Sequence, residues 1–289
     1  MSYEDVKKYA VEYFESQNGV NVRTEIVTKA DVVYDAIIVS KGTVGVCLNV
    51  KAIYDVYNSN VDMELYFKSI LQELEDAVTT KFCTVVSGIQ DWEKCKDLIR
   101  CRVINYEHNI GYLEDKVYKR FLDLAVVYVI AWANKDEYYS IVVNKSILES
   151  WSISMEVLDV VANQNMLEDD YLCLDIDDIL QESNTDKSLL SAIGVRNMMY
   201  VLTNVHKMFG AALVFTPGVL RECADKLGGT NLIVIPSSKH EVLLLKDKMD
   251  AEIVRRMVCE VNATQVSSED YLADNVYLYK YEEDVLVVC

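Results

Sequence analysis

Histidine is scarce in this sequence, and its scarcity limits the chemistry that can be expected. Only three histidines occur among the 289 residues, at positions 108, 206 and 240. No pair of the eight cysteines has the Cys-x-x-Cys spacing of zinc sites, and no cysteine clusters with histidine. We therefore expect neither a metal site nor another cofactor.

Basic residues are few relative to acidic ones. The chain has 28 lysines and arginines against 46 aspartates and glutamates, a formal net charge of −18. Binding to a phosphate backbone requires concentrated Lys and Arg, so direct contact with nucleic acid is not expected. Residues 149–186 contain eleven acidic side chains and no basic one. A high net charge commonly serves solubility.

Long hydrophobic runs are also missing. The longest, FLDLAVVYVIAWA at residues 121–133, is too short to span a bilayer and contains Asp123. The opening stretch, MSYEDVKKYAVEYF, lacks the uninterrupted apolar core of a signal peptide. These absences predict a cytoplasmic protein with reduced thiols and no membrane contact.

The familiar catalytic and nucleotide-binding motifs do not occur. There is no Gly-x-Gly-x-x-Gly and no Gly-x4-Gly-Lys-Ser/Thr, so nucleotide binding has no support. Neither Gly-x-Ser-x-Gly nor His-Glu-x-x-His is present. The acidic segment lacks the residue order of an EF-hand loop, and a solvated face is the simpler interpretation.

What the sequence does contain is typical of a globular fold. Apolar residues make up 51% and charged residues 26%, in a chain long enough for one large or two ordinary domains. Ser2 and Asp5 form a capping-box pattern that predicts a first helix ending at Asn18-Gly19. Residues 22–57 read as a strand meander, and residues 63–78 have helical periodicity.

The remainder alternates strands with helices. A hairpin is predicted around residues 134–137, with a first strand so apolar that it should be central in its sheet. Ser154 should begin a helix, and DIDDILQES, residues 175–183, another. MMYVLTN and AALVFT read as strands. Thr216-Pro217 should open a helix that Gly228 closes, and DAEIVRRMVCEVN, residues 250–262, reads as a helix.

We therefore expect an α+β fold with mixed, largely antiparallel sheets flanked by helices, in two lobes. The expected lobes are an N-terminal α+β lobe, 1–116, and a C-terminal α+β lobe, 117–289, which includes the acidic helical segment 149–186.

The stretch NLIVIPSSKHEVLLL, residues 231–245, is the main candidate site. Pro236 and the serines after it are turn residues between two apolar runs, so a hairpin-like turn is the simplest interpretation. If strand geometry resumes at Ser238, that residue and His240 share one face while Glu241 points to the other. The candidate binding residues are Ser237, Ser238, His240, Glu241 and Asn204.

Four segments resemble one protein family. YKRFLDLAVVYVI, MMYVLTNVHKMFGAALVF, IPSSKHEVLLL and CEVNATQVSSEDYLADNVYLY are similar, in order and spacing, to the domain-of-unknown-function 5688 family of gut Gram-positive bacteria and their mobile elements. WSISMEVLDVVANQ is more distantly similar to the YtpQ-like family, with Ser152 where glycine or threonine is usual. The resemblance implies a cytoplasmic bacterial protein and assigns no activity, cofactor or catalytic residue.

Three functional hypotheses follow. The first is a non-catalytic protein-interaction module with an unknown protein partner. The second is an acidic mimic of nucleic acid that occupies a basic protein, which requires regularly spaced carboxylates on one face of residues 149–186. The third is a hydrolase or transferase with a dispersed site, in which His240 is the base and Ser238 or Cys223 the nucleophile.

Overall fold

The computed structural model describes residues 1–29, 32–41, 44–79, 87–134, 137–176, 199–247, 249–267 and 270–289. The chain divides into two compact units, residues 1–95 and 96–289. The sequence placed the boundary near residue 117. In the structure, residues 99–105 pair along their length with the strand at 124–134, which places this segment in the second unit.

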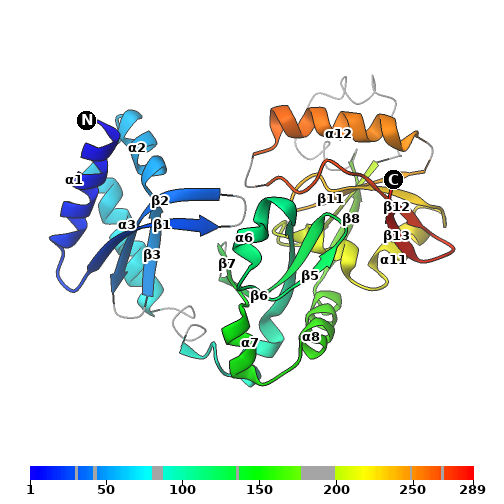
Figure 1. The fold of residues 1–289 in the computed structure, drawn as a ribbon, viewed down its shortest axis with the longest axis horizontal. Helices are drawn as coiled ribbons and strands as arrows, with labels where there is room; N and C mark the ends of the chain where they lie inside the picture. The colour runs from blue at the N-terminus through cyan, green and yellow to red at the C-terminus, as the bar shows by residue number, and fades with distance from the viewer. Residues whose placement is uncertain are drawn as a thin grey trace. The chain divides into compact units, whose positions relative to one another are not determined.

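Unit 1 is a three-stranded antiparallel sheet with helices on one face (Figure 1). Phe14 and Phe67 are fully buried, with ring centroids 5.0 Å apart, and they pack with Ile37 of the sheet. The capping box predicted at Ser2 and Asp5 is present. The elements are α1 (Tyr3–Glu15), β1 (Asn21–Lys29), β2 (Val32–Lys41), β3 (Val44–Asn49), α2 (Val50–Asn58), α3 (Met63–Thr79) and α5 (Trp92–Cys95).

The strand meander predicted for residues 22–57 ends earlier than expected. Residues 50–57 are helical, so the strand interpretation of VKAIYDVY was wrong. The side-chain oxygen of Asn49 accepts the backbone N–H of Lys51 at 2.8 Å and begins the helix. Val50 and Ile53, three positions apart, are both buried, which is helical and not strand periodicity.

Unit 2 contains two antiparallel sheets among its described residues. In the first, β6 lies between β4 on one side and β5 and β7 on the other. All side chains from Leu124 to Trp132 are buried, which confirms the predicted central strand. This half consists of η1 (Lys96–Leu98), β4 (Ile99–Asn105), η2 (Glu107–Asn109), α6 (Ile110–Leu113), β5 (Tyr118–Phe121), β6 (Leu124–Asn134), β7 (Glu137–Val142), α7 (Lys145–Trp151) and α8 (Met155–Glu168).

The second sheet has the strand order β13-β12-β10-β11-β9-β8. Helix α12 covers one face of this sheet (Figure 1). Val254 and Val258 of the helix pack against Ile233, Ile235 and Leu245 of the strands. Its elements are β8 (Tyr171–Asp175), β9 (Met199–Asn204), η3 (Gly210–Phe215), α11 (Val219–Lys226), β10 (Leu232–Ile235), β11 (Val242–Lys246), α12 (Ala251–Gln265), β12 (Tyr277–Lys280) and β13 (Val285–Val288).

Two expectations for this half differ from the structure or fall outside it, and one strand was missed. AALVFT was predicted as a strand but lies in the 3-10 helix η3, because a short apolar run does not by itself distinguish the two. Strand β8 was not predicted, since acidic residues surround it. Most of the helix predicted at residues 175–183 lies outside the described residues. The predicted α+β class with antiparallel sheets is confirmed.

Candidate functional site

The stretch at residues 236–241 is the connection between two paired antiparallel strands. Ile235 of β10 lies opposite Leu243 of β11, as the turn interpretation predicts. Strand geometry resumes at Val242 and not at Ser238, so the shared face expected for Ser238 and His240 does not form. The turn is held instead by its backbone, in which Ser238 N–H donates to the carbonyl of Glu241 at 3.3 Å.

Both ring nitrogens of His240 are engaged. The backbone N–H of Phe209 donates to Nδ1 at 3.3 Å, and Nε2 lies 3.3 Å from Oδ1 of Asp270. Because Nδ1 accepts a hydrogen bond, the ring proton belongs on Nε2, where it points to Asp270. Burial, and next the charge of Lys239, lower the pKa of His240 below its ordinary value of 6.5. The imidazole is therefore neutral at physiological pH.

Asp270 is the residue that anchors the turn. Its carboxylate lies 3.2 Å from Nζ of Lys239, and its carbonyl accepts the backbone N–H of Lys239 at 3.1 Å. Burial raises the pKa of Asp270, but hydrogen bonds from Ser267 and Lys239 outweigh it and leave the pKa below its ordinary value. Sequence reasoning missed Asp270, which lies thirty residues from His240 and carries no local signal.

Residues 203–210 approach the turn very closely. Oγ1 of Thr203 donates to the carbonyl of His240 at 2.8 Å. A Cβ at Gly210 would lie 2.7 Å from that same carbonyl and 2.5 Å from Oγ1 of Thr203, so only glycine fits. The ring of Phe209 lies 5.3 Å from that of His240, and the guanidinium of Arg102 covers Phe209 at 3.6 Å.

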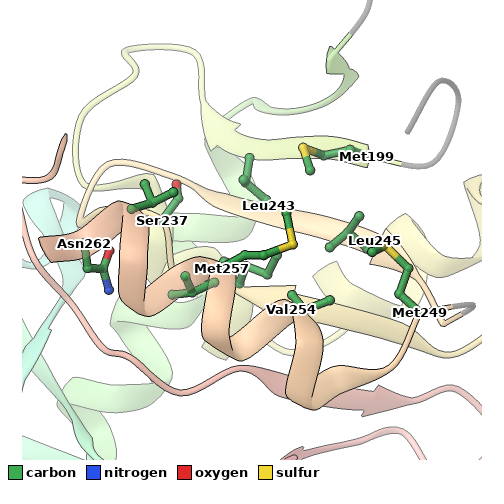
Figure 2. A pocket seen from close by; sticks show the side chains of 11 residues that line it. Met199, Ser237, Leu243, Leu245, Met249, Val254, Met257 and Asn262 are labelled. Carbon is green, nitrogen blue, oxygen red and sulfur yellow. The ribbon is translucent and has the colours of Figure 1, made fainter. Parts of the chain in front are cut away.

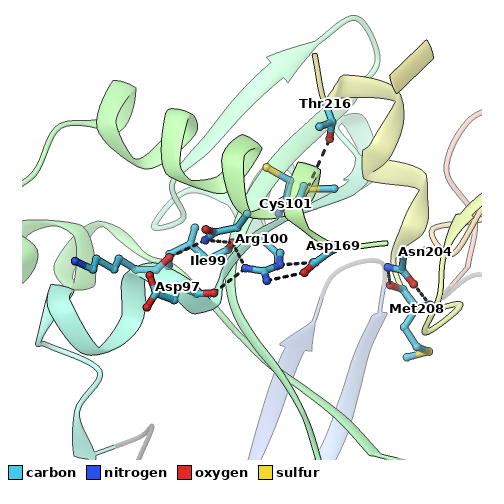
Figure 3. Close-up of polar contacts among 11 residues, drawn as sticks. Asp97, Ile99, Arg100, Cys101, Asp169, Asn204, Met208 and Thr216 are labelled. Carbon is cyan, nitrogen blue, oxygen red and sulfur yellow. Dashed lines mark hydrogen bonds and ion pairs between the residues drawn. The ribbon is translucent and has the colours of Figure 1, made fainter. Parts of the chain in front are cut away.

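Asn204, the remaining candidate and the last residue of β9, has its side-chain amide bonded to the loop that follows the strand. Nδ2 donates to the carbonyl of Met208 at 2.7 Å, and Oδ1 accepts the backbone N–H of Met208 at 3.2 Å (Figure 3). The structure thus brings Ser237, Ser238, His240 and Glu241 together in one turn. Asn204 is the last residue of β9 and lies beside Gly210.

The dispersed hydrolase site would need His240 beside a nucleophile. Oγ of Ser238 accepts the backbone N–H of His240 at 3.1 Å, while the imidazole is held by Phe209 and Asp270. Cys223 is fully buried, and its pKa is raised by a hydrogen bond with Cys173 and by burial, which disfavours the thiolate. This arrangement favours a structural role for the His240 ring.

A cavity lies next to the turn. It occupies about 200 Å³ between α12 and strands β9 to β11, and Ser237 is one of its few polar lining residues (Figure 2). Ser237 therefore belongs both to the turn and to the wall of an apolar cavity.

Within the described residues, no group of three His, Cys, Asp or Glu side chains is placed to hold a metal ion.

Helix α8 carries a different kind of surface. Its C-terminal end is fixed by Arg100, whose guanidinium donates to both carboxylate oxygens of Asp169 at 2.5 and 2.9 Å (Figure 3). Asn165, in the last turn of the helix, donates to the carbonyl of Ile99 at 3.0 Å and so holds this end of α8 on β4. No helix in the described part of the chain is long and apolar enough to cross a membrane.

Comparison with known proteins identifies the family. No curated protein matches the chain, and no solved structure matches it. The model of a family of unknown function, DUF5688, matches residues 3–281, nearly the whole length, and includes the turn, the cavity and α8. The more distant YtpQ-like resemblance stays a prediction. The chain is therefore a member of the DUF5688 family.

Proposed function

We propose that the chain is a non-catalytic interaction protein that holds a basic partner protein on the exposed face of α8. The observation that carries the proposal is that α8 is apolar on two faces. Leu158, Ala162 and Met166 are buried against the sheet. On the other side, Val157, Val160 and Leu167 are 45%, 55% and 47% exposed.

Such a helix is unusual at a surface. A surface helix normally has one apolar stripe facing the core and a polar stripe facing water, whereas a helix that is apolar all round is normally covered. Val157, Val160 and Leu167 follow i, i+3, i+10 spacing, with exposed Gln164 at i+7, so they share one face. An apolar stripe with a polar rim is typical of a protein contact site.

The rim of this stripe is acidic. Glu156 lies at its beginning, and Glu168 and Asp170 lie at its end, all exposed. The net charge of −18 adds a long-range preference for a positively charged partner. We therefore expect the partner to present an apolar centre surrounded by Lys and Arg. The opposite charges would speed association, and burial of the apolar centre would provide the affinity.

This contact differs from the acidic-mimic hypothesis. A mimic needs a row of carboxylates facing solvent, but Asp159 accepts from Tyr128 Oη at 2.7 Å and Asp169 is paired with Arg100. Residues 177–186 of the acidic segment lie outside the described residues. The apolar stripe, with acidic residues at its ends, supports the interaction hypothesis more directly than a carboxylate ladder.

The test variant loses the exposed apolar side chains of α8 and keeps those of its buried face. It carries serine in place of Val157, Val160 and Leu167. The matched control changes three exposed apolar residues of unit 1, Ile26, Val33 and Leu65, to serine. Thermal unfolding verifies that both variants are folded. The proteins that each immobilised variant retains from native lysate are then quantified by mass spectrometry.

We expect one basic protein to be retained stoichiometrically by the wild type and by the control, and to be lost from the α8 variant. With that protein purified, the α8 changes should weaken binding about tenfold or more. Retention should also fall as salt is raised, because the acidic rim contributes. Equal retention by the α8 variant, or no stoichiometric partner for the wild type, would refute the proposal.

A further inference from the structure

The cavity beneath α12 is separate from the α8 surface and has a chemistry of its own. It is lined by eleven residues, nine of them apolar, and its volume is about 200 Å³. Three methionines, Met199, Met249 and Met257, contribute to the wall. Methionine side chains are flexible and polarisable, so they adapt to apolar ligands of variable shape.

The polar groups of the cavity lie at one end. Ser237 and Asn262 are at the same end in Figure 2, whereas Met199 and Met249 are at the other. Met257 and Val261 line the cavity and are 46% and 50% exposed, so the cavity is reached from solvent along α12. A ligand that fits must be apolar along its length and polar at one tip.

The hydrogen bonds at the polar end decide which head group fits. Nδ2 of Asn262 donates to the carbonyl of Ala273 at 3.0 Å and to Oδ1 of Asp274 at 2.9 Å. Because the carboxylate of Asp274 fixes the amide orientation, the side-chain carbonyl of Asn262 is the group left for a ligand. A carbonyl accepts, so the head group must donate a hydrogen bond.

Charge narrows the choice further. The carboxylate of Asp274 contacts Asn262 directly, and the whole chain carries a net charge of −18. A carboxylate or phosphate head would be repelled and would bring no donor. A neutral hydroxyl or amide satisfies both conditions without the cost of desolvating an ion in an apolar site. Oγ of Ser237 makes only a long 3.3 Å bond to the carbonyl of Glu241 and can also pair with such a head group.

The volume indicates the size of the ligand. An engineered apolar cavity of about 150 Å³ binds benzene. This cavity, at about 200 Å³, is larger and therefore has room for a short alkyl chain. We propose that the cavity under α12 binds a neutral amphipathic molecule, an alkyl chain with a hydroxyl or amide head, with the head at Ser237 and Asn262.

The experiment titrates full-length protein labelled at its methionine methyl groups with 1-heptanol and follows the methyl signals by NMR. We expect saturable shifts of Met199, Met249 and Met257 and no shift of Met63 or Met166, which are buried in other cores. Heptanoate, which has the same chain and a charged head, should bind at least about tenfold more weakly at neutral pH.

Two variants of α12 supply the control. Val261→Phe places a ring in the cavity and should weaken 1-heptanol binding by about tenfold or more. Ile253→Phe adds the same ring on the same helix at a similarly exposed position that does not line the cavity, and should leave binding unchanged. Both sites are half exposed, so the variants should fold.

The proposal is overturned if 1-heptanol causes no saturable shift up to its solubility limit, or if both variants weaken binding equally. Binding of heptanoate as tight as that of 1-heptanol would overturn the assigned head group. If the signals of the three methionines shift when only the protein concentration is raised, without 1-heptanol, a second copy of the chain occupies the site. None of these outcomes depends on the α8 surface, so the two proposals fail independently.

Discussion

Oη of Tyr277 in β12 donates a hydrogen bond of 2.5 Å to Oδ1 of Asp123, the residue in the turn between β5 and β6. The bond joins the two sheets of unit 2 across 154 residues of sequence. Asn275 donates to the other carboxylate oxygen at 3.1 Å. Asp123, which interrupts the longest apolar run of the sequence, thus has a structural reason to be there.

Tyr277→Phe should destabilise unit 2 while preserving its shape. Tyr277 is 2% exposed, and a hydrogen bond to a charged group contributes about 1.5–3 kcal/mol. We expect a loss of that order in the free energy of unfolding, measured by chemical denaturation. Tyr281→Phe removes the same kind of bond, to Asp225, at an exposed site and should cost clearly less. Equal losses in the two variants would contradict a special role for the Asp123 bond.

His240 should give the stability of the protein a dependence on pH. Burial and Lys239 lower its folded-state pKa below 6.5, so below that pH the unfolded chain binds a proton that the folded chain does not. This contribution is therefore present above about pH 6.5 and is lost as the pH falls towards the folded-state pKa. The free energy of unfolding, measured from about pH 8 to pH 5, should decline accordingly.

Two substitutions of His240 isolate that contribution. His240→Asn can keep an acceptor for Phe209, and His240→Gln can keep a donor towards Asp270, but neither titrates. Each should fold with a loss of about 1 kcal/mol or less, and each should show a shallower decline with pH than the wild type. A decline as steep in both variants as in the wild type would mean that other groups cause it. Partner binding should survive both changes.

Gly210→Ala should destabilise the region where η3 meets the turn. The new Cβ would lie 2.5 Å from Oγ1 of Thr203, 2.7 Å from the carbonyl of His240 and 2.8 Å from the backbone nitrogen of Asn204. Overpacking of this kind costs about 1–3 kcal/mol. Gly111→Ala, in α6, has nothing within 4 Å and should be neutral or slightly stabilising in the same thermal unfolding experiment. An unchanged midpoint for Gly210→Ala would show that the turn can move away.

Val127→Asp should prevent soluble expression. Val127 lies in β6, is 1% exposed, and is paired with Arg102 on one side and Tyr118 on the other. Burying a carboxylate costs several kcal/mol, on the order of the whole stability of a domain, and an ion pair with Arg102 on the neighbouring strand offsets only part of that cost. Val33→Asp, at an exposed strand position, is the control and should express normally. Soluble Val127→Asp protein with a wild-type midpoint would contradict a buried central strand.

Local sequence patterns predicted much of the fold. The period-3.6 pattern and the Ser2 cap correctly predicted α1, and the Ser154 cap predicted α8. Apolar, β-rich runs separated by turn residues predicted the hairpins β6–β7 and β10–β11. These features depend on residues within a few positions of one another. The errors at α2 and η3 arose where short apolar runs fit two periods, so that neighbouring elements decide the conformation.

The candidate site was predicted less completely for a physical reason. The sequence identified the turn and its residue types, and by itself it determined that this is an acidic α+β chain with a central apolar strand. It did not reveal that His240 lies between Phe209 and Asp270, that Gly210 must lack a side chain, or that Ser237 faces a cavity. His240 is 30 or 31 positions from Phe209, Gly210 and Asp270, and a cavity is volume that packing leaves unfilled. Only the packing of β9, η3, β11 and α12 against one another brings these groups within contact distance, because no local periodicity records which distant side chain will be the neighbour.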